Sequence, residues 1–76
     1  MSYSVRFKTA LPAEGGEEIA RVVQQIAEAV TTISPSNPFW GSLGDSQLQI
    51  DVAGYRVFYR IDALRQEIIV VEVSAN

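Results

Sequence analysis

The side chains best suited to chemistry in this chain are arginines, and the densest group is Arg56, Arg60 and Arg65 in its C-terminal third. Guanidinium groups bind phosphate and carboxylate oxygens, so this group could hold a nucleic-acid backbone or an acidic partner. The chain contains no Cys and no His, which removes thiolate zinc sites, disulfides and histidine general bases. Its acids lack the spacing of a calcium loop or of a converging carboxylate pair. The sequence therefore predicts no metal and no cofactor.

Two other features could carry chemistry, but each has a simpler structural interpretation. Trp40 is predicted to close the edge of a small core, with a ligand-binding ring as the alternative. The segment Gly41 to Gly44 precedes a strand and is too short for a phosphate loop, so it predicts a turn. Ser42 and Ser46 have no recognisable base to activate them.

The N-terminal half predicts one strand followed by one helix. Residues 2–9 alternate strictly, which is typical of a half-buried strand. After Pro12 the apolar side chains take helical spacing, and Gly15 and Gly16 leave the first residue of the helix open. The helix should end near Thr31 to Ser34, since Pro35 and Pro38 cannot continue it, and residues 34–44 are expected to form a loop. The helical stripe consists of Ile19, Val22, Val23, Ile26, Val30 and Ile33.

The C-terminal third predicts three short strands joined by tight turns. They cover about 48–52, 55–61 and 67–73, with a turn at Ala53 and Gly54 and a loop from Asp62 to Arg65. The last strand is apolar on both sides, as expected for an interior strand or one covered by a partner. The predicted fold is thus α+β: a four-stranded, mainly antiparallel sheet with one long amphipathic helix on one face, in the order β-α-β-β-β.

One helix can cover only one face of such a sheet, so the other face should stay open. The covered face should hold Tyr3, Val5, Phe7, Leu48, Ile50, Val52, Val57 and Ile61. An uncovered patch that mixes cations with apolar groups predicts a docking surface, whereas the simpler alternative is that surface arginines lie over apolar neighbours and keep the sheet soluble. The predicted binding residues on the open face are Arg6, Lys8, Gln49, Arg56, Phe58 and Arg60.

Length and charge limit the partners. Residues 1–76 suit a single domain, and so small a core predicts association with another protein or a second copy. A net charge of −3 argues against general nucleic-acid binding. No apolar run is long enough for a bilayer and the N-terminus lacks a signal-peptide layout, so no membrane partner and a cytoplasmic location are expected.

The stretch from Gly54 to Asp62, GYRVFYRID, resembles the RelE/ParE superfamily of toxin-antitoxin toxins. In that superfamily a Gly-Tyr-Arg-hydrophobic-hydrophobic-Tyr strand recurs. The opening strand, the helix after it, and Leu43-Gly44 before a hairpin are similar as well, so the likeness spans nearly the whole chain. The resemblance implies a bacterial protein with a RelE/ParE-like fold that a partner antitoxin holds inactive.

The resemblance also indicates a degraded catalytic site. In the RelE branch, basic residues of the open face and of a C-terminal tail support ribosome-dependent mRNA cleavage. Arg56 alone matches that set, because Gln49 and Asp51 replace two basic positions and the chain stops at Asn76. Losing one transition-state donor typically costs about 10²- to 10³-fold in rate. The ParE branch, which acts on DNA gyrase through protein contacts, is not excluded by these losses.

Three hypotheses follow. The first is a toxin-like module that binds an antitoxin or a macromolecular target through the open face and has little or no catalysis. The second is a weak mRNA endoribonuclease on the ribosome, with Arg56 on phosphate and Tyr55 or Tyr59 stacking on bases. The third is a non-catalytic structural domain that forms a homodimer through the same face or through the edge of its sheet.

Overall fold

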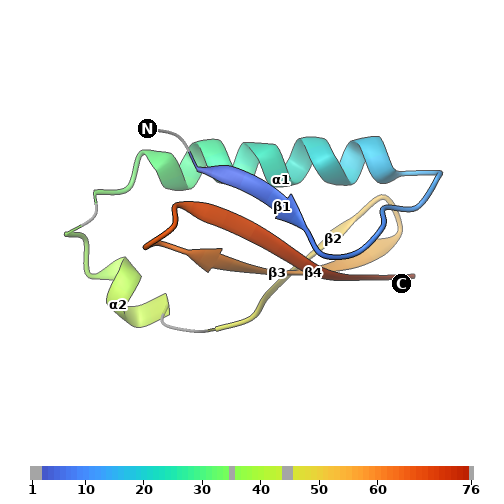
Figure 1. Cartoon of the computed structure of the whole chain (residues 1–76). Helices are drawn as coiled ribbons and strands as arrows, with labels where there is room; N and C mark the ends of the chain where they lie inside the picture. Colours follow the sequence, from blue (N-terminus) through green and yellow to red (C-terminus); the bar gives the residue numbers. More distant parts are fainter. Residues whose placement is uncertain (1–2, 35, 44–45, 76) are drawn as a thin grey trace.

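The computed structural model describes residues 3–34, 36–43 and 46–75, and Figure 1 shows a sheet with one long helix running along one side of it. Ser2 of the predicted first strand, Pro35 at the predicted helix end, and Gly44 of the predicted turn lie outside these ranges. Within them the predicted α+β architecture is confirmed. In this part of the chain, no helix is long and apolar enough to cross a membrane.

The long helix, α1, comprises Gly16–Thr31 and follows the predicted stripe. Gly15 precedes it with φ of 86°, a left-handed conformation that a residue with a Cβ adopts only at a cost. The helix ends where predicted, and the Thr31 hydroxyl donates to the Ala27 carbonyl at 2.7 Å. The same oxygen accepts the Tyr3 backbone N–H at 3.0 Å, which ties the end of α1 to the start of the sheet. The buried residues of α1 are Gly16, Ile19, Val23, Ala27 and Val30.

In the described residues, the sheet has four strands in the order β1-β4-β3-β2. Their bounds are Ser4–Phe7 for β1, Leu48–Val52 for β2, Tyr55–Asp62 for β3 and Glu67–Ala75 for β4. Among the described strands, only the β1–β4 pair is parallel, so the sheet is mainly antiparallel as predicted. The last strand lies between β1 and β3, which confirms the interior position that its apolar sequence indicated.

The turn between β2 and β3 sets the register of that hairpin. Ala53 has φ of 53° and Gly54 has φ of 82°, as in the two-residue turns that match the twist of paired strands. Val52 therefore lies opposite Tyr55. The antiparallel pairing continues one residue at a time to Leu48, which lies opposite Tyr59. A β-bulge at Phe58/Tyr59 shifts the pairing of β3 with β4, so that Phe58 faces Glu72 while Tyr59 faces Val70.

The prediction of a loop at 34–44 is wrong in one respect, because Phe39–Leu43 form a short helix, α2. The side-chain oxygen of Asn37 accepts the Phe39 N–H at 2.9 Å, which satisfies a free donor at the helix start. Pro38 immediately precedes α2, where its missing N–H costs nothing. In Figure 1, α2 lies at the end of the sheet away from the C-terminus.

The core lies between α1 and one face of the sheet. Its largest fully buried side chains, among the described residues, are Ile19, Val23, Val57, Ile68 and Val70. Trp40 of α2 extends this core by stacking on Tyr3, with ring centroids 5.8 Å apart and planes 4° from parallel. Its indole N–H donates to the Ser34 carbonyl at 2.9 Å. The predicted role of Trp40 as a closing residue of the core is therefore confirmed.

Candidate functional site

The candidate site is the face of the sheet opposite α1, here called the open face. The observed register places its side chains in rows that cross the strands. All the predicted strand residues of the binding face lie in these rows, while Lys8 follows β1, is exposed, and donates its backbone N–H to the Val70 carbonyl at 2.9 Å. The rows are Ser4, Glu67 and Asp62; Arg6, Ile69 and Arg60; Glu72, Phe58 and Gln49; and Ser74, Arg56 and Asp51.

Arg56, the predicted catalytic residue, is paired with an acid. Its Nε lies 3.2 Å from Oδ1 of Asp51, directly opposite on β2. Both side chains are about half exposed, so the pair contributes only about 0–1 kcal/mol to stability. Its effect on chemistry is larger, because a carboxylate beside the guanidinium repels any phosphate that approaches it.

Arg6 and Glu67 form a second ion pair across the parallel strands, with 3.6 Å between the guanidinium and carboxylate groups. The Glu67 side chain is largely buried, at 14% exposure, and lies opposite the acid Asp62. Two acids directly opposite each other are unfavourable, so Arg6 offsets a local repulsion. Among the described residues, Glu67 Oε1 is a buried oxygen with no hydrogen-bond partner, so Arg6 provides its charge compensation.

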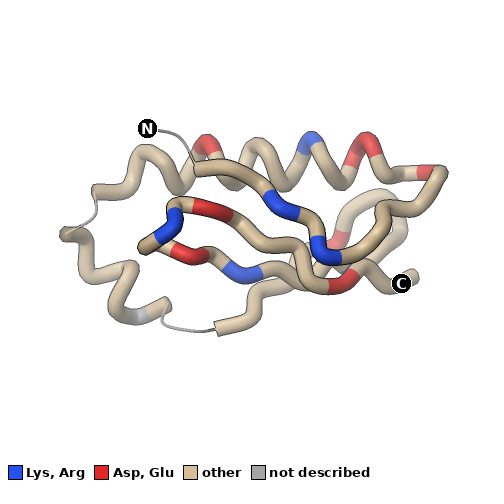
Figure 2. Tube along the Cα trace, viewed as in Figure 1, with Lys and Arg blue, Asp and Glu red and all other residues tan. Residues whose placement is uncertain are grey.

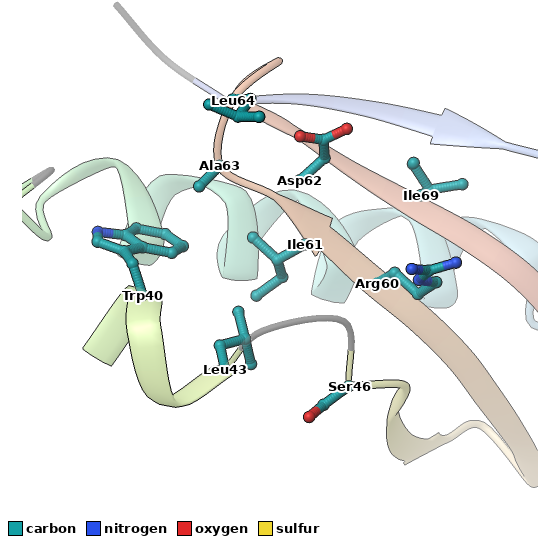
Figure 3. A pocket seen from close by; sticks show the side chains of 9 residues that line it. All are labelled: Trp40, Leu43, Ser46, Arg60, Ile61, Asp62, Ala63, Leu64 and Ile69. Carbon is teal, nitrogen blue, oxygen red and sulfur yellow. The ribbon is translucent and has the colours of Figure 1, made fainter. Parts of the chain in front are cut away.

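The centre of the open face is apolar. Ile69 lies between Arg6 on β1 and Arg60 on β3, and Figure 3 shows Arg60 and Ile69 projecting from neighbouring strands. Phe58 lies beyond the bulge, and both apolar side chains are half-buried. Arg6 and Arg60, which flank Ile69, are both exposed.

Acids balance the cations over the open face. Figure 2 shows acidic and basic positions interspersed along the strands. Arg6, Lys8, Arg56 and Arg60 are matched by Asp51, Asp62, Glu67 and Glu72. A polyanion needs an excess of cations, so this face is unsuited to a nucleic-acid backbone and suits a protein surface with apolar and mixed polar groups.

A pocket of about 440 Å³ adjoins one corner of the open face. Figure 3 shows Trp40 and Leu43 of α2 on one side of it and Ile61, Ala63 and Leu64 on the other. Leu64, at the turn between β3 and β4, is 98% exposed. The pocket contains no group of three or more acids among the described residues that could hold a metal ion.

The tyrosines do not join Arg56 on the open face. Tyr55 and Tyr59 lie opposite Val52 and Leu48 on the side that faces α1, so the predicted stacking on bases beside Arg56 is wrong. Burial raises the pKa of the Tyr59 hydroxyl. Burial, and secondly the negative charge of Asp62, raises the pKa of the Tyr3 hydroxyl. Neither the Tyr55 ring nor the Tyr59 ring is placed to act on a ligand at Arg56.

Sequence reasoning missed the partner of Arg56, although a signal for it was present. A two-residue turn at Ala53 and Gly54 requires Asp51 to lie opposite Arg56. Once β4 is placed beside β3, strand register in the same way predicts that acidic and basic side chains are mixed on the open face. The pairing of Arg6 with Glu67 depends on a parallel neighbour, which sequence spacing alone does not specify.

Comparisons with known proteins give one distant structural likeness. No protein-family profile matches the chain, and no curated protein matches it. A solved structure that does match is the crystal structure of the toxin-antitoxin complex RelBE2 from Mycobacterium tuberculosis. The match has 18% sequence identity and a TM-score of 0.47, and it covers 100% of each chain.

Proposed function

We propose that this chain is a toxin-type module of a toxin-antitoxin system that acts by binding proteins through its open face. Two features support the proposal: the RelE/ParE-like stretch from Gly54 to Asp62, and a sheet face whose centre is apolar and whose charges are internally matched. The second feature carries more weight, because protein interfaces combine an apolar centre with a polar rim, and the half-buried Phe58 and Ile69 lie beside charged side chains.

The proposed partner is a helix-forming, antitoxin-like protein. An amphipathic helix can lay an apolar stripe over Phe58 and Ile69, with polar side chains on either side of the stripe. The surrounding ion pairs then form a rim that fixes orientation more than affinity. Phe58 is the expected anchor, because aromatic side chains near the centre of an interface carry most binding energy.

The proposal includes a degraded catalytic site, as the resemblance implies. Arg56 is already paired with Asp51, and Gln49 contributes no cation beside it. Weak mRNA cleavage on the ribosome remains the alternative function, and no contact on the open face favours it over protein binding.

The test uses the product of the neighbouring reading frame, which should be a small helix-forming protein if this chain is a toxin-type module. The two proteins are purified and titrated by calorimetry. Phe58→Glu should raise the dissociation constant at least about 30-fold, because it places an unpaired charge at the centre of the interface. The matched control is Phe39→Glu, since Phe39 is a 38% exposed ring on α2, away from the centre of the open face.

Growth provides the second readout. Induction of the wild-type chain in a bacterial host should slow growth, and co-expression of the neighbouring protein should restore it. Equal affinity of wild type and Phe58→Glu for the neighbouring protein would rule out the open face as the docking surface. Absence of any complex between the two purified proteins would contradict the antitoxin assignment.

A further inference from the structure

The outer edge of β2 is a second interaction surface, distinct from the centre of the open face. β2 is the last strand in the sheet order and pairs with β3 alone among the described strands. Its outer side therefore presents backbone groups that no other described strand satisfies. Such an edge is a template for another strand unless charge, proline or a bulge blocks it. β2 contains no proline and no lysine, and its pairing with β3 is regular.

The hairpin turn fixes which backbone groups point outward. In a two-residue hairpin, the residues that flank the turn exchange hydrogen bonds with each other. Val52 and Tyr55 flank the turn, and bonded pairs recur at every second position back along β2. Ile50 and Leu48 therefore direct their N–H and C=O groups toward β3. Gln49 and Asp51 direct theirs away from the sheet.

We propose that β2 binds β2 of a second copy of this chain, antiparallel and centred on Ile50, to give a two-fold symmetric dimer with a continuous sheet. In this register Gln49 lies opposite Asp51 of the other copy, and each pair exchanges two backbone hydrogen bonds through the outward groups. Because the two-fold axis passes through Ile50, Leu48 lies opposite Val52 of the other copy. The apolar side chains of both β2 strands therefore stay on the α1 side of the continuous sheet.

The side chains of β2 match themselves in this register. Ile50 meets its own copy at a position where opposed side chains approach closely, and the half-exposed Ile50 and Leu48 gain apolar neighbours. The Gln49 amide can donate to the Asp51 carboxylate of the other copy. Arg56 already offsets the charge of Asp51 at 3.2 Å, so bringing two copies together adds little repulsion.

The opposite edge of the sheet does not offer the same match. β1 has only four residues, and Arg6 and Lys8 are spaced along it and just beyond its end. An antiparallel pair of β1 strands centred on Arg6 places that arginine opposite itself. Like charges directly opposite each other oppose pairing, so the second copy should choose β2.

The test changes one exposed side chain in opposite directions. Gln49→Asp places two acids opposite each other at both symmetric positions, whereas Gln49→Lys places a cation opposite Asp51. The dimer dissociation constant from sedimentation equilibrium should rise about 2- to 30-fold in the first variant and fall by a similar factor in the second. Gln25→Asp and Gln25→Lys make the same changes on the exposed side of α1 and should leave it unaltered.

Amide hydrogen exchange tests the register directly. Raising the protein concentration should slow exchange at Gln49 and Asp51, while Leu48 and Ile50 stay equally protected throughout. A protein that is monomeric at all concentrations up to about 1 mM would overturn the proposal. So would a dimer whose dissociation constant is the same in both Gln49 variants, or whose new protection lies on β1.

Discussion

At the scale of single residues, Arg56 is the side chain on which any catalytic role would depend. Its guanidinium lies beside Asp51 and has no second arginine in its row of the open face. Stabilising charge on a phosphorane-like transition state requires cations that are free to approach the phosphate. The open face offers Arg56 in a charge-neutral pair instead.

We therefore expect Arg56→Ala to have no catalytic consequence. Messenger RNA in a translation extract should stay intact with wild type and variant alike, as measured by primer extension. The free energy of unfolding should change by less than about 1 kcal/mol, because the lost pair is a surface one. Cleavage by the wild type that disappears in Arg56→Ala would show that Asp51 does not silence the site.

Tyr59 gives a prediction for the dependence of stability on pH. Burial raises the pKa of its hydroxyl in the folded chain, so the folded state retains the proton at alkaline pH where the unfolded state releases it. The stabilisation is complete below about pH 10 and is lost as the pH rises through the folded pKa. Urea unfolding between about pH 8 and 11 should show this fall.

Tyr59→Phe should flatten that fall without changing the fold, because the ring remains. Tyr3→Phe should add to the effect, since burial and the charge of Asp62 raise the pKa of Tyr3 as well. An alkaline decline that is identical in wild type and the double variant would assign the loss of stability to other groups.

At the scale of elements, the glycine before α1 and the glycine within α2 have opposite requirements. Gly15 has φ of 86°, and a Cβ there would lie 3.1 Å from the Ala53 Cβ. Gly15→Ala should therefore lower the free energy of unfolding by about 1–2 kcal/mol, as measured by urea titration followed by circular dichroism. Gly41 lies within α2, and a Cβ added there would meet open space, so this position supplies the matched control.

Gly41→Ala should be neutral or stabilising by up to about 1 kcal/mol, because alanine is the better helix former. If both substitutions had the same effect, neither the left-handed turn before α1 nor the contact with Ala53 would constrain the fold.

The elements also show what a sequence can specify. Period-two alternation predicted the first three strands and their two faces, and the apolar stripe that begins at Ile19 predicted α1, whose end at Thr31 lies within the predicted range of Thr31 to Ser34. α2 was missed because five residues carry too little periodicity to stand out. The sequence did contain a local signal for α2, because Asn37 followed by Pro38 is a favourable helix start. This signal was overlooked because residues 34–44 were expected to form a loop.

At the scale of the whole molecule, the net charge of −3 and the balanced open face lead to the same prediction. The protein should pass through a heparin column at about 0.1 M salt, because its overall charge is negative and acids balance the cations over the open face as a whole. Asp51→Lys combined with Glu72→Lys should be retained, since it replaces two of the acids that balance the open face with cations. Retention of the wild-type protein on the column would show that the open face attracts a polyanion, which contradicts its assignment as a protein-binding surface.

The two-faced arrangement of the molecule could be predicted, but the charge balance of the open face could not. Arg6, Arg56 and Arg60 were correctly expected on one face from alternation alone. Asp51, the acid beside Arg56, lies in the same hairpin, but Glu67 reaches Arg6 from a strand distant in sequence, and the order β1-β4-β3-β2 decides that meeting. Strand order depends on tertiary packing, which short-range patterns do not encode.

The central position of β4 has a consequence for how the protein is made. β4 is the last of these four strands to be synthesised, yet both β1 and β3 need it as a neighbour. Until residues 67–75 emerge, a nascent chain can form α1 and the β2–β3 hairpin but has no partner for its first strand. Translation that halts before Glu67 should yield an unfolded fragment that proteases remove, so the open face is complete only once residues 67–75 have been added.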